Sequence, residues 1–185
     1  ELSLVGYVQT LVAEASRTWD WFWFTPRDPV VLGLLRVLAG LMLVYTHAVW
    51  GLKLETFLGP QPFIEFDALR DVYDGSWATF WPFVPAAAVA PVHYACLVVL
   101  VLFTVGLWTR VTSILAAVIT ISYANRLFFA TFGLDQINAM LAFYLALSPS
   151  GDALSIDQYR RGRRTGSEPW AAAPSIGANI GIRLI

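Results

Sequence analysis

The sequence predicts an all-α integral membrane protein, a helical bundle of about four spanning helices plus the start of a fifth. Two observations carry this prediction. The chain is 57% hydrophobic and only 14% charged, with a mean hydropathy of +0.61, which is too little charge to cover a soluble domain of this length. Apolar runs of roughly membrane length also recur along it, at residues 30–52, 91–108, 111–128 and 134–148.

Composition also excludes several classes of function. The net charge of -1 gives no reason to expect nucleic-acid binding. The single cysteine, Cys96, lies inside an apolar run, so disulfide scaffolds and thiolate metal sites are excluded. The two histidines fall in different apolar runs, and no metal site is predicted. The lipid bilayer is the expected partner, together with other membrane subunits, and the cofactor is left unknown.

Residues 2–24 are expected to form an amphipathic helix lying in the membrane interface. Apolar residues recur near helical spacing, but charged residues interrupt any span. The segment closes on Trp-Asp-Trp-Phe-Trp-Phe at residues 19–24, an aromatic cluster typical of an interfacial anchor. The whole chain is rich in such residues, with eight tryptophans and seven tyrosines.

Residues 30–52 form the first predicted span, because 20 residues at helical rise cover ~30 Å, the thickness of the hydrocarbon core. Gly33, Arg36, Gly40 and His47 fall near one face, where the glycines let a neighbouring helix approach closely. Arg36 is expected to snorkel to the near interface or to form a structural salt bridge. His47, near the opposite end, is either a packing residue or a functional base.

Residues 53–89 are predicted to form a folded cap on the outer membrane surface. Prolines at 60, 62, 82 and 85 prevent a long helix. Because long ordered loops are often functional, the cap is one candidate for a functional segment. The alternative is that it only covers the helix bundle as a lid.

The stretch 125–148 holds the predicted site. Its two apolar segments meet at a short turn, residues 131–133, and carry polar groups only beside that turn. Such groups are costly in a membrane unless they pair or line a wet cavity, so we expect an Arg126–Asp135 pair or an outward-facing pocket. The candidate catalytic residues are Asp135 and His47. The candidate ligand-binding residues are Arg126, Asn138, Asn125 and Arg36.

Basic residues predict the orientation. Seven lie on one side, in residues 17, 27, 110, 160, 161, 163 and 164, against three on the other, at 53, 70 and 126. The richer side is expected to be cytoplasmic, which places the N-terminus and a basic loop at 150–176 inside. The cap and the 131–133 turn are then expected on the outer side of a bacterial inner membrane. Residues 177–185 are expected to start a fifth span that is cut short. Residues 1–185 are expected to form a single membrane domain, which is the N-terminal part of a longer one.

The order of several short segments resembles a known family. Residues 24–29, Phe-Thr-Pro-Arg-Asp-Pro, precede Leu32, Arg36 and Gly40. Later come Met-Leu-Ala-Phe at 140–143, then Ser-Ile-Asp at 155–157 and the basic run. This set resembles the N-terminal part of the horizontally transferred transmembrane domain (HTTM) family, to which vitamin K-dependent gamma-carboxylase belongs.

The resemblance implies a bacterial multi-pass membrane protein, but not the carboxylase reaction. The carboxylase's proposed base is a lysine just after the segment matching residues 180–185, and the only lysine here is Lys53. A carboxylase histidine falls near Leu134 and Asp135, where this chain has none. The family name by itself fixes no reaction.

Three functions are open at this point. The first is an enzyme, with a quinone-like or lipid substrate entering between helices and Asp135 and His47 as proton-transfer groups. The second is a non-catalytic accessory or scaffold subunit of a membrane complex, its polar turn a structural ion pair. The third is a small-molecule transporter. The sequence shows neither the inverted repeat nor the paired broken helices that would favour it.

Overall fold

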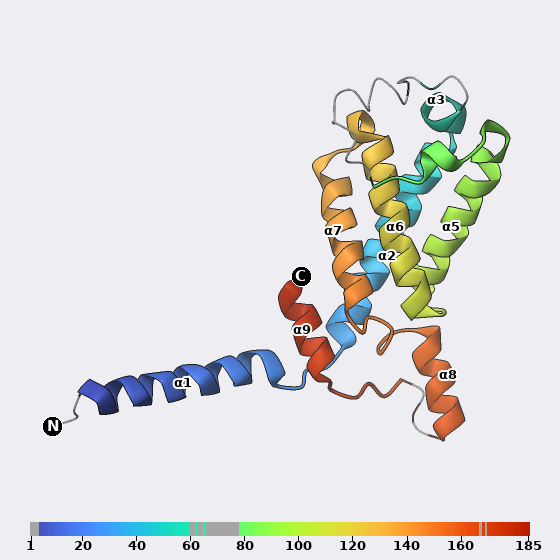
Figure 1. Ribbon diagram of the computed structural model, residues 1–185. Helices are drawn as coiled ribbons and strands as arrows, with labels where there is room; N and C mark the ends of the chain where they lie inside the picture. Colours follow the sequence, from blue (N-terminus) through green and yellow to red (C-terminus); the bar gives the residue numbers. More distant parts are fainter. Residues whose placement is uncertain (1–3, 60–61, 63–64, 66–77, 167, 169) are drawn as a thin grey trace.

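The computed structural model describes residues 4–59, 62, 65, 78–166, 168 and 170–185. Within these residues the chain is helical, with an isolated antiparallel bridge between Arg27 and Ser175 and no strand. Figure 1 shows an upright helical bundle with further helices at both ends. The all-α fold class is confirmed.

The bundle consists of α2 (Val30–Gly51), α5 (Val89–Val105), α6 (Thr109–Arg126) and α7 (Gly133–Leu147). Helix α2 packs against α5 and α7, and α6 packs against the same two helices, so the four close into a ring. All four predicted apolar runs are helical, within three residues of the expected bounds. Two stretches, Val30–Gly51 and Ala86–Val105, are long and apolar enough to cross a membrane.

The bundle carries apolar side chains outside and many polar ones inside. Exposed large apolar residues occur on each of its helices, among them Leu38, Val98, Ile114 and Met140. The buried polar side chains of the bundle are Arg36, His47, His93, Thr104, Thr109, Thr112, Ser113, Thr120, Ser122, Arg126 and Asn138. Contiguous exposed apolar surface marks a membrane or protein interaction site, and buried polar groups need partners.

Small residues bring α2 against its neighbours, as their spacing predicts. An ideal Cβ on Gly40 would lie 2.9 Å from the Cβ of Thr104 on α5. One on Gly33 would lie 2.6 Å from the carbonyl oxygen of Ala153. Neither position has room for a larger side chain, so α2 approaches α5 and the turn after α7 at backbone distance.

The α5–α6 turn depends on a glycine. Gly106 has φ +72°, a left-handed conformation that glycine adopts at little cost. The amide of Leu107 donates to the carbonyl of Leu102 at 3.0 Å, and that of Gly106 to Phe103 at 3.1 Å. This pattern is a Schellman motif, which ends α5 and turns the chain directly into α6.

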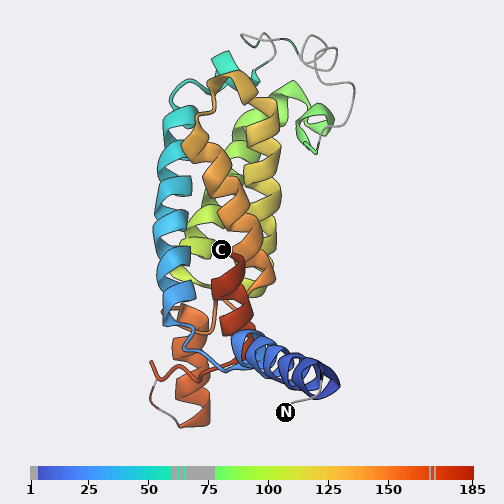
Figure 2. The same ribbon diagram turned by 90° about the vertical axis from the view of Figure 1, so that its left-hand side faces the viewer.

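One end of the bundle, here the α8 end, carries α1 (Leu4–Phe24), α8 (Ile156–Thr165) and α9 (Ile176–Leu184). Figures 1 and 2 show α1 pointing away from the foot of the bundle. Its aromatic side chains include exposed ones, Tyr7, Trp19, Trp21, Phe22 and Phe24. Residues 150–176, predicted as a basic loop, in fact contain α8. Ser155 nucleates this helix because its hydroxyl accepts from the amide of Gln158 at 2.9 Å.

Helix α9 anchors the end of α1. The side-chain amide of Asn179 donates to the carbonyls of Phe22, at 2.7 Å, and Trp23, at 2.9 Å. Arg183 donates to the Asn179 side-chain oxygen at 3.0 Å and stacks on the Phe22 ring, 3.5 Å from its centroid. The last carbonyls of α1 are thereby satisfied.

The opposite end, here the α3 end, carries α3 (Leu54–Leu58) and the short 3₁₀ turns Trp81–Phe83, Ala86–Ala88 and Phe128–Ala130. These belong to the predicted cap or to the turn before α7. Most of residues 60–77 lie outside the described residues, so the predicted cap as a whole is only partly covered.

Candidate functional site

The structure brings most of the predicted site residues to one end of the bundle. His47 lies near the end of α2, Asn125 and Arg126 close α6, and Asp135 and Asn138 open α7, all towards the α3 end. Arg36 lies in the opposite half of α2. It is therefore not part of the same site.

Asp135 caps a helix. Its Oδ2 accepts from the amide of Phe132 at 2.9 Å, at the start of α7. Among the described residues, the structure shows an ion pair between Arg161 and Asp152 at 3.1 Å and none between Arg126 and Asp135. The alternative, an outward-facing pocket, stays a prediction. Asn125 donates to the carbonyl of Ala78 at 3.0 Å, which ties α6 to the segment before Trp81.

Arg36 is fully buried, at 0% exposure, and its guanidinium is held by backbone carbonyls. It donates to Leu154 at 2.6 Å, to Ala153 at 3.3 Å and to Ser150. The sequence predicted that Arg36 snorkels to the interface or forms a salt bridge. Instead, main-chain carbonyl oxygens of the turn after α7 accept hydrogen bonds from its guanidinium. A planar guanidinium can satisfy several carbonyls at once, so Arg36 fastens this turn to α2.

His47 presents one free nitrogen in the core. Its Nδ1 lies 2.8 Å from the carbonyl oxygen of Leu43, and since a carbonyl only accepts, Nδ1 carries the hydrogen. Nε2 of the neutral ring is then an acceptor. This atom is buried and has no hydrogen-bond partner among the described residues.

A second buried histidine, His93 on α5, has the complementary arrangement. Its Nδ1 lies 2.6 Å from the hydroxyl of Tyr123 on α6. That hydroxyl makes no other hydrogen bond among the described residues, so its hydrogen is satisfied only by donation to Nδ1. We assign the tautomer on this basis: Nε2 of His93 carries the hydrogen. This atom faces the α2 backbone at His47, without the geometry of a full hydrogen bond to any described residue.

Aromatic rings enclose the two imidazoles. Trp50 stacks on Tyr123, with centroids 5.5 Å apart and planes 6° from parallel. The His47 and Tyr123 rings lie nearly edge to face, with centroids 4.4 Å apart. The Trp81 and Tyr123 rings are arranged in the same way, with centroids 5.1 Å apart. We call these five residues, His47, Trp50, Trp81, His93 and Tyr123, the His47–His93 cluster. Since both histidines are 1% exposed, the cluster is a buried, mostly apolar site. Three of its polar atoms make no hydrogen bond to a described residue: Nε2 of His47, Nε2 of His93 and Nε1 of Trp81.

The α2 backbone lies directly against His93. An ideal Cβ on Gly51 would lie 2.9 Å from Nε2 of His93. Gly51 therefore leaves the space in which this nitrogen sits. Because Nδ1 is held by Tyr123, the ring is oriented by two helices at once.

The two imidazoles of the cluster can offer one hydrogen-bond acceptor and one donor to a ligand that reaches it. Such a pair matches a hydroxyl and a carbonyl on the same molecule, or a proton moving between them. Among the described residues, no three histidine, cysteine or acidic side chains gather to hold a metal ion. Arg126 and Asn138 are also buried in this half of the bundle, and the Asn138 Nδ2 has no partner among the described residues.

Sequence reasoning missed His93 and Tyr123 as site residues. One signal was present: both histidines of the chain fall inside apolar runs, where an ionisable group is itself a functional indication. The contact between them was not predictable, because it depends on how α5 and α6 pack against α2.

No protein-family model, curated protein or solved structure matches the chain. The resemblance to the HTTM family therefore stays a prediction from the residues quoted above.

Proposed function

We propose that the chain is a bacterial HTTM-type multi-pass membrane protein and forms part of an enzyme acting on a quinone-like or lipid substrate. The His47–His93 cluster is its proton-transfer site. The supporting observation is that two buried imidazoles from different helices each keep an Nε2 that makes no full hydrogen bond to a described residue, although that of His93 faces the backbone of His47. A buried polar atom without a partner is rare in native proteins and calls for a ligand, a water or a catalytic role.

The two nitrogens have different roles in the proposed reaction. Nε2 of His47 accepts a hydrogen bond, and then the proton, from a substrate hydroxyl. Nε2–H of His93 donates to a substrate carbonyl, and Tyr123 holds that ring in the donating tautomer. His93 thus takes the place expected of Asp135, whose carboxylate is used at the start of α7.

The proposed setting is the inner membrane, with four spans and the N-terminus in the cytoplasm. The apolar exterior of the bundle supports lipid contact. The arginines of α8 and the α5–α6 turn gather at the α8 end, which the positive-inside rule assigns to the cytoplasm. The His47–His93 cluster then lies in the outward half, within reach of a substrate that diffuses in the bilayer.

Quinone binding tests this proposal. The protein in lipid nanodiscs is titrated with a short-chain benzoquinone, and tryptophan fluorescence is followed, because Trp50 adjoins the His47 ring and Trp81 adjoins the Tyr123 ring. Wild-type protein should show saturable quenching. His93→Phe keeps a ring but loses the donor to a quinone carbonyl, so it should weaken quinone binding about tenfold to a hundredfold, as expected for a buried hydrogen bond. His47→Phe loses only an acceptor, so its matching effect should appear with the corresponding quinol, whose hydroxyl can donate to Nε2.

Asp135→Asn is the matched control, because its amide oxygen still accepts from Phe132 while the charge is gone. It should bind as wild type does. Quenching that never saturates, and that is equal in wild type and both histidine variants, would contradict quinone binding. A co-purifying lipid that is lost from His47→Phe would assign the substrate to the lipid class instead.

A non-catalytic accessory subunit is the second candidate. It is favoured by the structural uses already found for predicted site residues: Arg36, Asn125 and Asp135 each bond backbone atoms. Purification with stoichiometric membrane partners, and an activity of that complex unchanged by His47→Phe and His93→Phe, would support this reading over the enzyme.

A further inference from the structure

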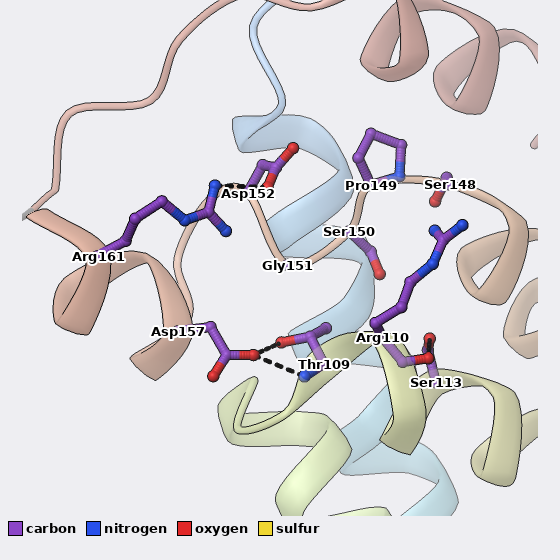
Figure 3. Close-up of a pocket in the computed structure, with 10 residues that line it drawn as sticks. All are labelled: Thr109, Arg110, Ser113, Ser148, Pro149, Ser150, Gly151, Asp152, Asp157 and Arg161. Atoms are coloured by element: carbon purple, nitrogen blue, oxygen red, sulfur yellow. Dashed lines mark hydrogen bonds and ion pairs between the residues drawn. The ribbon is translucent and has the colours of Figure 1, made fainter.

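We propose that a cavity at the α8 end binds a phosphate group. The cavity holds about 300 Å³ and lies between the first turn of α6, the turn after α7 and the start of α8. Figure 3 shows two arginines among its lining residues, Arg110 from α6 and Arg161 from α8. The site is separate from the His47–His93 cluster and does not depend on the function proposed for it.

Arg110 is the cation that this cavity leaves available. Its guanidinium makes no hydrogen bond or ion pair with any residue that the structure describes, whereas Arg161 is paired with Asp152 at 3.1 Å. In Figure 3 the Arg110 side chain extends past Ser113 towards Ser148. A guanidinium offers five N–H donors in a planar fork suited to phosphate oxygens.

The acidic groups of the cavity are already compensated. Asp157 accepts from the amides of Trp108, at 3.0 Å, and Thr109, at 2.6 Å, and from the Thr109 hydroxyl at 2.8 Å. Asp152 is held by Arg161. Neither carboxylate is hydrogen-bonded to Arg110, so its donors are open to an entering anion, and the exposed arginines of α8 (160, 163 and 164) offset the negative charge that Asp157 keeps.

The surroundings of Arg110 match the two parts of a phospholipid. Trp108, 68% exposed, lies two residues away, as expected of an aromatic residue at a membrane interface. Ile114 and Val118 follow Arg110 at intervals of four residues, so all three share one face of α6, and both apolar side chains are about half exposed. A phosphate at Arg110 thus places acyl chains along an apolar stripe.

Native mass spectrometry tests the site and separates the two sources of phosphate. Detergent-solubilised protein is titrated with phosphatidylglycerol, with phosphatidylcholine, and with inorganic phosphate. Phosphatidylglycerol should bind wild-type protein, and Arg110→Gln should weaken it about tenfold or more, as expected for charge-assisted bonds. Arg160→Gln is the matched control: it removes the same charge at the same end but does not line the cavity, so binding should change less than about twofold.

Each outcome decides something. Arg110-dependent lipid binding that millimolar inorganic phosphate does not displace supports the site with a lipid as source. Arg110-dependent binding of inorganic phosphate itself supports it with the free ion as source. If Arg110→Gln and Arg160→Gln weaken binding equally, or neither does, the proposal is overturned. A melting temperature close to wild type for Arg110→Gln, and recovery in Arg110→Lys, excludes misfolding as the cause.

Discussion

Replacing Arg36 by methionine should destabilise the protein strongly. Methionine fills much of the same volume but has no donor, so the carbonyls of Ser150, Ala153 and Leu154 lose their partner. Each unsatisfied buried acceptor costs about 1–3 kcal/mol, and removing one member of a buried charged network typically costs about 3–5 kcal/mol in all.

The assay is thermal unfolding in detergent. For a chain of this size, each kcal/mol lowers the melting temperature by about 2–4 °C, so Arg36→Met should melt roughly 6–20 °C below wild type. Arg36→Lys keeps the charge without the planar fork and should recover part of the loss. Arg17→Met, on exposed α1, is the control and should shift little. Equal melting temperatures for Arg36→Met and wild type would refute the carbonyl contacts.

Three further substitutions follow from the same geometry. Gly106→Ala should cost about 1–2 kcal/mol from its left-handed backbone alone, and more because its Cβ would lie 2.9 Å from the Arg36 guanidinium carbon; a melting curve like that of wild type would contradict this. Gly51→Ala should displace the His93 ring and weaken quinone quenching without removing any polar atom, so unaltered quenching would count against His93 as a ligand contact. Asp157→Ala should release α8 from α6 and cost about 1–2 kcal/mol, read out as faster amide hydrogen exchange in α8 than in α2.

The helices of the bundle were predictable, and several of their contacts were not. The long apolar runs predicted helices from local composition, and the spacing of Gly33 and Gly40 predicted a close approach of neighbouring segments to α2. The structure has both the helices and the close approach. The basic segment after α7 was read as a loop because its charge hid the cap at Ser155 and the short helix that follows.

The roles of the polar residues depended on tertiary packing. An arginine and an aspartate near one turn favour an ion pair, yet the structure shows Asp135 accepting from the local amide of Phe132 and no ion pair between the two described residues. Arg36 found main-chain oxygens more than a hundred residues away in sequence. Periodicity places a residue on a helix face, but it does not say which neighbour that face meets.

The bond between Asn179 and the end of α1 has a consequence for the order of assembly. The two residues joined, Asn179 and Phe22, are separated by 157 positions. Because α1 precedes the bundle in the chain and α9 follows it, this bond can form only after all four bundle helices have been synthesised. The aromatic end of α1 is therefore one of the last parts of the described chain to gain its protein partner.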